Sequence, residues 1–425
     1  MSGQFPATNG MVGYADGVEW NPAATMPGEL RRAGYQTAII GRNMHLWPPD
    51  KQYGFTHMKL QDGRGGRVDD YEQFLRSHEA TAQSDYFGFG INRAHGISGN
   101  GWTARPWHMD ESAHPTTWTV SEASRWLRQR DTTQPYFMVT SFIAPHPPLV
   151  PPAFYLDRYL RADMPDPAIG DWAEPPPNGG KGMAIDADWV NLKGEALRSC
   201  RAGYYGLINH IDDQIYRLLF DAGSSGAMRN TVVIFTADHG EMLGDHYLFR
   251  KCYPFEASAR IPMMMFSTAD LGFKPQTVAD QPVCLEDIMP TVLDLAGCEI
   301  PEGVDGRSLA PLLRGEKDAT WRPYLHGEHA RCYRKEQSNH YLTDGHMKYV
   351  WMTEAGTELL FDIDNDPNEL KNLAVDAAHH ETLARWRSRL IRQLQGRPEG
   401  FTDGEKLIAG RPHEACLPHV HGVSA

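Results

Sequence analysis

Two side chains that can bind a metal ion, Asp238 and His239, directly follow a short hydrophobic run in residues 232–235. The run is β-branched and aromatic, which predicts a buried strand. Open α/β sheets bind ligands beyond the carboxyl ends of their strands, so chemistry is expected at this position. A carboxylate and an imidazole suit Ca²⁺, Mg²⁺ or Mn²⁺ when further oxygen ligands join them. Turn chemistry alone would also explain an Asp-His-Gly after a strand, and the pattern by itself leaves both interpretations open.

Other candidate residues follow the ends of two more predicted strands. Arg42 and His45 come after the strand predicted for residues 35–40, and His146 comes after the strand predicted for residues 136–143. The guanidinium of Arg42 could bind a sulfate or phosphate through two parallel hydrogen bonds. A single histidine is more often a hydrogen-bonded structural residue than a catalyst. Three histidines at three strand ends, counting the one in the Asp-His-Gly segment, favour a catalytic cluster.

Lys251 lies close downstream of the Asp-His-Gly segment. Its ammonium suits a tetrahedral anion or the oxygen that leaves it. An isolated lysine is usually a solvated surface charge, so this assignment depends on the surrounding segment. Asp245 and His246 lie in the same segment, and we interpret this pair as structural groups that stabilise the loop.

The order of predicted elements indicates the fold class. Strands and helices alternate in residues 1–318, which predicts an α/β domain with a large mixed, mostly parallel sheet flanked by helices. Residues 319–425 are assigned to a smaller C-terminal α+β subdomain, in which an antiparallel sheet precedes one amphipathic helix. We expect long loops over residues 48–115 and 151–185. Helices are predicted at residues 25–33, 119–130, 195–222 and 286–296, and a third core strand at residues 231–236.

Composition argues against several classes of protein. The chain has 425 residues and a formal net charge of −13, so its surface as a whole does not favour nucleic acid. No apolar run approaches the ~20 residues of a membrane helix, and the first residues carry no signal-peptide pattern. The six cysteines show no metal-binding or disulfide spacing, which favours free thiols and a cytoplasmic location. A signal peptide upstream of Met1 would change the expected location.

Residues 236–262 resemble the sulfatase family of the alkaline-phosphatase superfamily. This segment contains Thr-Ala-Asp-His-Gly-Glu-Met-Leu-Gly-Asp-His and ends in Arg260-Ile261-Pro262. Weaker matches extend over the rest of the chain, among them Pro145-His146-Pro147, residues 305–309 and residues 358–362. The resemblance implies hydrolysis of a sulfate monoester with one divalent metal ion. It assigns Asp238 and His239 as metal ligands and Ca²⁺ as the ion, with Mg²⁺ and Mn²⁺ as alternatives.

The resemblance also implies roles for the remaining candidates. Arg42 and Lys251 would hold the sulfate oxygens. His146 with Lys251 would protonate the leaving oxygen, and His45 would then take a proton from a covalent intermediate. The family has Gly-Lys-x-His where this chain has Gly41-Arg42-Asn43-Met44-His45, so the cation is changed and the spacing is longer by one residue.

The family's nucleophile is not present in this sequence. Sulfatases of this kind use a formylglycine made from Cys or Ser in Cys/Ser-x-Pro-x-Arg, preceded by an Asp pair on the first strand. Cys252 has Glu256 in the position of the arginine, and Cys416 has Val420 there. We therefore expect the nucleophile segment upstream of Met1 and predict that the chain as given is inactive.

Two other functions stay open from the sequence. One is a phosphonate monoester or phosphodiester hydrolase of the same superfamily, because both enzymes act on tetrahedral anions. The other is a catalytically inactive relative that binds sulfate esters. The expected partner is a small-molecule or carbohydrate sulfate ester, with no nucleic acid and no membrane. The aromatic residues between positions 102 and 118 could stack on a sugar or aromatic ring, or could equally belong to a core.

Overall fold

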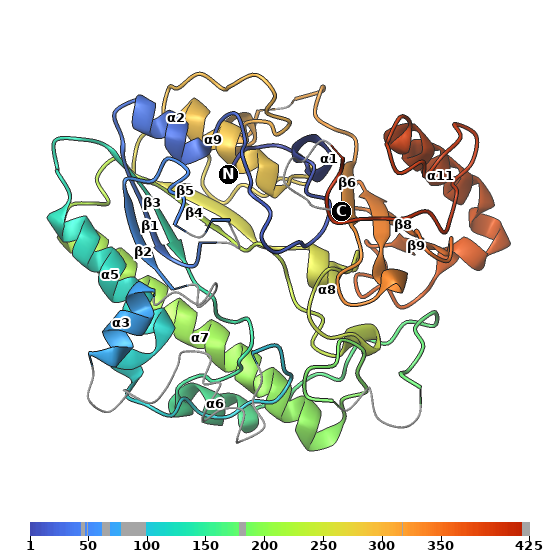
Figure 1. Cartoon of the computed structure of the whole chain (residues 1–425), viewed down its shortest axis with the longest axis horizontal. Coiled ribbons are helices and arrows are strands. Elements are labelled where there is room, and N and C mark those ends of the chain that lie inside the picture. Colours follow the sequence, from blue (N-terminus) through green and yellow to red (C-terminus); the bar gives the residue numbers. More distant parts are fainter. Residues whose placement is uncertain are drawn as a thin grey trace.

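The protein has an α/β body joined to a smaller C-terminal unit, as the computed structural model in Figure 1 shows. The structure describes residues 1–43, 47–48, 50–61, 69–77, 99–177, 184–316 and 318–418. The fold class predicted from the sequence, with parallel strands, flanking helices and a C-terminal antiparallel sheet, is confirmed. The strands of the α/β body are β1 (Gln36–Gly41), β2 (His57–Leu60), β3 (Tyr136–Ser141), β4 (Val232–Thr236) and β5 (Met263–Ser267).

The five strands pair as two separate sheets within the described residues. Three strands are parallel in the order β2-β1-β3, with Ile39 of β1 opposite Val139 of β3. The β4 and β5 strands form an antiparallel pair in which Thr236 lies opposite Met263. Phe235, Met264 and Phe266 on this pair are exposed. The strands β1, β3 and β4 each end at residues that the sequence assigns to chemistry.

Helices cover the strands and connect them (Figure 1). The longest, α7, runs directly into the segment that leads to β4 and packs against α5 and α6. Their bounds are α1 (Pro6–Asn9), α2 (Met26–Arg32), α3 (Asp70–Arg76), α5 (Pro115–Gln129), α6 (Ala153–Leu160), α7 (Gly194–Ser224), α8 (Glu256–Ala259), α9 (Ile288–Leu295) and α10 (Ala310–Leu313). No helix in the described ranges combines the length and the apolar character that a membrane crossing requires.

The start predicted for α5 is wrong. The sequence predicts a helix over residues 119–130, but the helix begins at Pro115, which occupies the first turn. His114 is the N-cap, and its Nδ1 accepts a hydrogen bond from the backbone N–H of Thr116. Histidine is outside the usual group of capping residues, so no residue pattern marks this helix start.

The two predicted long loops contain regular structure. The β2 strand and α3 lie within residues 48–115, and α6 lies within residues 151–185. Trp107, His114 and Trp118 are buried, so these side chains belong to the core and do not form an open stacking surface. The stretch at α6 is flanked by prolines, and Pro152 caps this helix and does not interrupt it.

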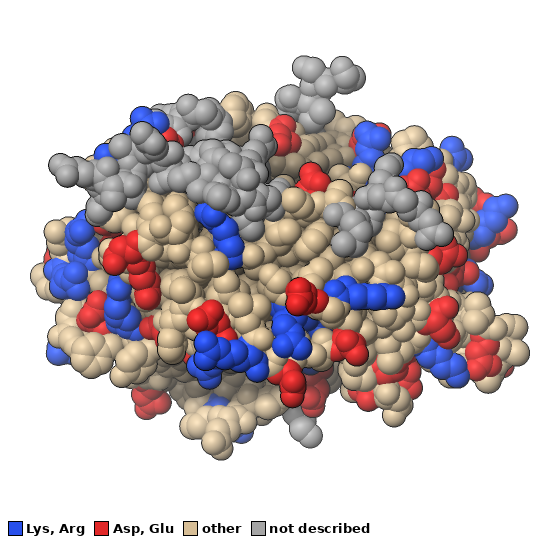
Figure 2. Space-filling model, turned by 90° about the horizontal axis from the view of Figure 1, so that it is seen from below, with Lys and Arg blue, Asp and Glu red and all other residues tan. Residues whose placement is uncertain are grey.

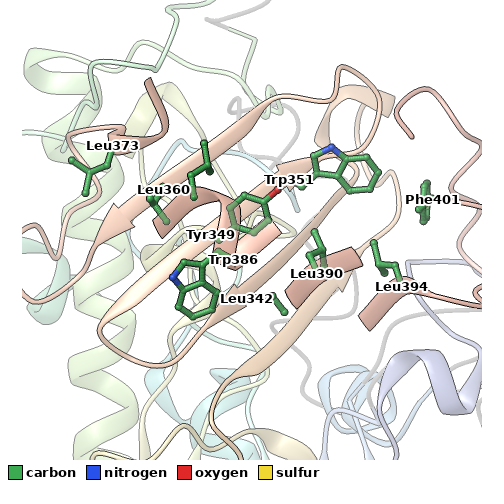
Figure 3. Close-up of a cluster of buried hydrophobic side chains, with 10 residues drawn as sticks. Leu342, Tyr349, Trp351, Leu360, Leu373, Trp386, Leu390, Leu394 and Phe401 are labelled. Carbon is green, nitrogen blue, oxygen red and sulfur yellow. The ribbon is translucent and has the colours of Figure 1, made fainter. Parts of the chain in front are cut away.

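The C-terminal unit is a sheet of four antiparallel strands covered by one helix. The strand order is β6 (Leu325–His329), β7 (Asn339–Thr343), β8 (Met347–Met352) and β9 (Glu358–Asp362), and α11 (His380–Leu394) packs against it. Figure 3 shows Trp386, Leu390 and Leu394 of α11 facing Leu342, Tyr349 and Leu360 of the sheet. The apolar face expected for this helix from the sequence is therefore the one that it buries.

Charged side chains of both signs are interspersed on the face shown in Figure 2. No broad area of one sign is visible among the described residues there. An anion that binds this protein is therefore expected to depend on cations gathered in a local site.

Candidate functional site

The first part of the site follows β1. Gly41 has φ 105°, and a Cβ at this position would lie 1.9 Å from the carbonyl oxygen of Ser141. Only glycine allows β1 and β3 to approach so closely here. The next residue, Arg42, donates its backbone N–H to the same oxygen at 3.0 Å and is 7% exposed. This places a buried guanidinium at the carboxyl end of the strand.

His146 is oriented by its own backbone. Its backbone N–H donates to the carbonyl oxygen of Ile143 at 3.0 Å. Its Nδ1 lies 2.7 Å from the carbonyl oxygen of Pro147, and because a carbonyl can only accept, Nδ1 carries the hydrogen. The other ring nitrogen, Nε2, is then left with a lone pair.

Lys251 is the hydrogen-bond partner of the lone pair on His146 Nε2. The distance between Lys251 Nζ and His146 Nε2 is 2.6 Å, so the ammonium donates to the imidazole. Burial, and then the charge of Lys251, lower the pKa of His146 well below its ordinary value. Burial also lowers the pKa of Lys251, and Arg42 acts in the same direction. The pair therefore holds one proton between two nitrogens.

Asp238 and His239 follow β4, as the sequence predicts. Gly240 and Glu241 donate their backbone N–H groups to Ser258 and Ala257, both at 2.8 Å, which fixes the loop against α8. His239 Nδ1 lies 2.8 Å from the carbonyl oxygen of Gly240 and therefore carries its hydrogen. The lone pair of Nε2 lies 3.6 Å from Oδ2 of Asp238, so the two residues present an imidazole nitrogen and a carboxylate oxygen side by side.

The donor set of Asp238 and His239 suits a divalent ion, but it is small. A calcium ion takes six to eight oxygen ligands, and these two residues provide two donor atoms. Among the described residues, neither belongs to a group of three convergent ligand atoms.

The sequence did not identify Glu241 as a member of the site. Its side chain is partly buried. Desolvation raises the pKa of the carboxyl to about 7, with Lys251 and Arg250 opposing that rise. A carboxyl that titrates in this range places a variable negative charge beside the ammonium of Lys251. The sequence offered no signal for this role beyond its position in the family segment.

His329 of β6 is a second residue that the sequence did not identify. Its Nδ1 bonds the carbonyl oxygen of Ala330, as the other two site histidines bond the carbonyl of their next residue. Burial lowers its pKa, and the charge of His239 contributes in the same direction, so the two rings are electrostatic neighbours. The C-terminal unit therefore brings one imidazole to the site, and no motif around His329 indicates this.

The other predicted residues are placed as follows. His45 lies outside the described residues. Asp245 accepts from Arg201 at 2.8 Å, and His246 Nδ1 accepts from the backbone N–H of Gly170 at 3.1 Å. Both contacts fix a neighbouring loop, in agreement with the structural role expected for this pair.

Comparisons with known proteins support the resemblance. The model of the family described as "Sulfatase" matches residues 1–298, and that described as "N-sulphoglucosamine sulphohydrolase, C-terminal" matches residues 244–396. An arylsulfatase of Clostridium perfringens is 40% identical, over 99% of this chain and 88% of the relative. A choline-sulfatase of Rhizobium meliloti is 29% identical, over 88% of this chain and 71% of the relative.

A solved structure is similar in fold. The phosphonate monoester hydrolase SpPMH from Silicibacter pomeroyi superimposes with a TM-score of 0.73, covering 93% of this chain and 84% of the other. The two sequences are 24% identical, so this similarity supports the fold and does not bear on the substrate.

Proposed function

The chain belongs to the sulfatase family, and on that premise we propose that its site serves the hydrolysis of a sulfate monoester. The observation that carries this proposal is the bond between Lys251 and His146 at 2.6 Å, formed beside the buried guanidinium of Arg42. Two cations in one partly buried site, of which Lys251 can also donate a proton, suit an ester that carries negative charge and releases an oxygen.

Arg42 and Lys251 would bind the sulfate oxygens. Arg42 is almost fully buried, and Lys251 is partly buried, so their attraction for an anion is weakened little by water. The planar guanidinium can contact two oxygens at once, whereas the ammonium acts as a point charge. Both cations lower the pKa of His146, and a bound anion would reverse part of that effect.

The Lys251–His146 pair would protonate the leaving oxygen. When the sulfur–oxygen bond breaks, that oxygen takes an electron pair and needs a proton, and general acid catalysis is typically worth about 10²–10⁴-fold. In the protein without substrate, the hydrogen between the two residues belongs to Lys251, because His146 Nδ1 already donates to Pro147. We therefore assign the proton to Lys251 and its orientation to His146.

Asp238 and His239 would hold a divalent ion, with Ca²⁺ first and Mg²⁺ or Mn²⁺ as alternatives. When bound, this ion would supply positive charge next to the transferred group. The nucleophile would be the formylglycine that membership of the family implies. Because the printed sequence contains no Cys/Ser-x-Pro-x-Arg, we propose that this chain alone does not turn over sulfate esters.

The proposed substrate class is a sulfated small molecule or carbohydrate. The relatives named as arylsulfatase and choline-sulfatase support a sulfate ester over a phosphonate. A fusion protein tests the proposal: a segment with the family pattern, an Asp-Asp strand followed by Cys-x-Pro-x-Arg, is joined upstream of Met1, and the cysteine is converted to formylglycine. We expect this fusion to hydrolyse nitrophenyl sulfate faster than a nitrophenyl phosphonate.

Two variants of the fusion make this test specific. Arg42→Met should lose most of the sulfatase activity, and the matched variant Arg31→Met on the outer side of α2 should keep it. The unfused chain should show no activity above buffer. A fusion that prefers the phosphonate would contradict the proposed substrate class, and equal activity of both arginine variants would contradict the role of Arg42.

A further inference from the structure

We propose a second metal site in the C-terminal unit, formed by Glu328, His340 and His413, that takes a transition-metal dication such as Zn²⁺. The site does not depend on the proposed sulfatase function. One ligand atom from each residue lies within 4.8 Å of the others, and this is the only such group of three among the described residues.

The fold brings the three residues together from distant positions. Glu328 of β6 lies directly opposite His340 of β7 in the antiparallel register, so their side chains leave the sheet on the same face. His413 comes from the chain after α11, and its ring is stacked on that of His340, with centroids 5.0 Å apart. Successive residues of a strand face opposite sides, so His329, which reaches the first site, lies on the other face of β6.

Unpartnered nitrogens are the second observation that indicates a ligand. His340 is fully buried and His413 is 6% exposed. Nε2 of His340 and both ring nitrogens of His413 are buried without a hydrogen-bond partner. Leaving a buried polar atom unpaired costs about 1–3 kcal/mol, so three of them at one place require an explanation. A metal ion bound to Nε2 of His340 and to one nitrogen of His413 would give partners to two of the three.

The protonation state of both rings suits coordination. Burial lowers the pKa of His413 to about 4 and that of His340 well below its ordinary value. Both imidazoles are therefore neutral at neutral pH, which is the form that binds metals. His326 Nε2 lies 3.0 Å from Nδ1 of His340, and in the tautomer in which this Nδ1 carries the hydrogen, Nε2 of His340 keeps its lone pair.

The charge balance around the site also favours a cation. Two buried carboxylates, Glu328 and Glu399, share one guanidinium, that of Arg397. Arg397 contacts both oxygens of Glu328, at 3.0 and 2.7 Å, which orients this carboxylate and leaves lone pairs for a metal. Together with the neutral histidines, the buried group carries one net negative charge. A buried charge of this kind is normally balanced by a partner or a metal ion.

The surroundings resemble those of a structural metal site. Phe401 lies against both histidines, with ring centroids 5.1 Å from His340 and 5.0 Å from His413. Trp351 stacks on His340 at 6.1 Å, and Figure 3 shows Trp351 and Phe401 on the side of the core nearest the end of α11. Apolar walls exclude water, and the contacts of His326 and Arg397 orient the ligands, as supporting residues do in zinc proteins.

The two imidazoles and one carboxylate indicate which metal ion the site would bind. Nitrogen ligands favour zinc and its neighbours over Ca²⁺, which prefers oxygen. Tetrahedral zinc with bonds near 2.1 Å requires ligand atoms roughly 3.4 Å apart, so the ligands must move inward by about 1 Å on binding. His413 lies in a segment that is neither helix nor strand, so no backbone ladder holds it in place. The ion would then fasten the segment that carries His413 to the strand that presents His329.

Metal binding by the whole chain tests the proposal. The protein is stripped with a chelator and titrated with ZnCl₂ in a competitive assay. Wild type should bind one equivalent of zinc at the second site. The double variant Asp238→Ala/His239→Ala should bind the same equivalent, because it changes only the first site. His413→Gln should weaken this equivalent by at least about 100-fold, since even supporting residues contribute 10–100-fold. His346→Gln, an exposed histidine of the same unit, is the matched control and should bind as wild type does.

Cobalt binding provides a spectroscopic readout that does not depend on the folding of the His413 variant. Co²⁺ added to the Asp238→Ala/His239→Ala protein should give the intense visible bands of tetrahedral coordination, and ZnCl₂ should abolish them. Absence of these bands in that protein would overturn the site. Equal zinc affinity of wild type and His413→Gln, with both folded by circular dichroism, would also overturn it.

Discussion

Lys251 Nζ and His146 Nε2 lie 2.6 Å apart, although the two residues are 105 positions apart in the sequence. The contact joins the segment after β4 to the segment after β3. Because the ammonium occupies the lone pair of Nε2, His146 cannot take a second proton without breaking this bond. The two residues therefore titrate together, and a measured pKa belongs to the pair.

Removal of the ammonium should raise the pKa of His146. In Lys251→Met the cation that opposes protonation of the ring is lost, and Nε2 becomes free to accept a proton. The ¹H–¹³C NMR signal of His146, followed from about pH 8 to about pH 4, should titrate at higher pH in the variant than in wild type. Lys274→Met, an exposed lysine, should leave the curve unchanged. A curve that is identical in wild type and Lys251→Met would contradict the pairing.

Acid should destabilise the protein partly through His210. Burial lowers the pKa of this ring to about 4, below the 6.5 of an ordinary histidine. The folded state thus binds fewer protons than the unfolded state, so the contribution to stability is complete above pH 6.5 and is lost as the pH falls toward 4. Between about pH 7.5 and about pH 5, the stability lost through His210 amounts to about 2 kcal/mol. In urea unfolding, His210→Gln should lose less free energy of unfolding on acidification than wild type does, and the difference should be about 2 kcal/mol.

His346 provides the control of opposite sign. This exposed ring donates a hydrogen bond to Asp364, and this bond and the carboxylate charge raise the pKa of His346. Its contribution to stability is therefore present at low pH and is lost as the pH rises. His346→Gln should therefore lose slightly more stability on acidification than wild type does. A variant His210→Gln with the same pH dependence as wild type would show that His210 does not contribute as described.

Lys348 should be essential for joining the C-terminal unit to α8. Its side chain is 1% exposed, and Nζ contacts Glu369 at 2.9 Å and Glu256 of α8 at 2.6 Å. Lys348→Met leaves two carboxylates without a cation, and breaking a buried pair in this way costs about 3–5 kcal/mol. Urea unfolding should show this loss, and Lys348→Met/Glu369→Gln should recover part of it. Lys335→Met, which removes the solvent-exposed pair with Glu354, should have little effect.

The core strands could be predicted from the sequence because their β-branched and aromatic runs are short and end at polar residues. The β5 strand could not be predicted, because Met263, Met264 and Met265 have no strong preference for strands. Asp238, His239 and Lys251 were found because one segment contains them. The contact of Lys251 with His146 depends on tertiary structure, so no local sequence pattern could predict that these two side chains meet.

The residues that the sequence missed share one property. His329 and His340 lie on strands, His413 lies in a segment without helix or strand, and none of them has a recognisable motif. Their neighbours are set by strand register and by the path of the chain after α11. The tautomer of His329 depends on a bond to its own backbone, which no sequence pattern encodes. For these residues, position in the fold and unpaired ring nitrogens are the informative signals.

Cys332 should be the most reactive thiol of the chain. A hydrogen bond from Cys252, and the charges of Lys251 and Arg250, lower the pKa of Cys332, whereas burial raises that of Cys200. The thiolate is the nucleophile, so Cys332 should be alkylated first by iodoacetamide at about pH 7. Peptide mass spectrometry over a time course measures the order. Cys332→Ser should abolish the fast phase and Cys416→Ser should not; a fast phase that persists in Cys332→Ser would contradict this assignment.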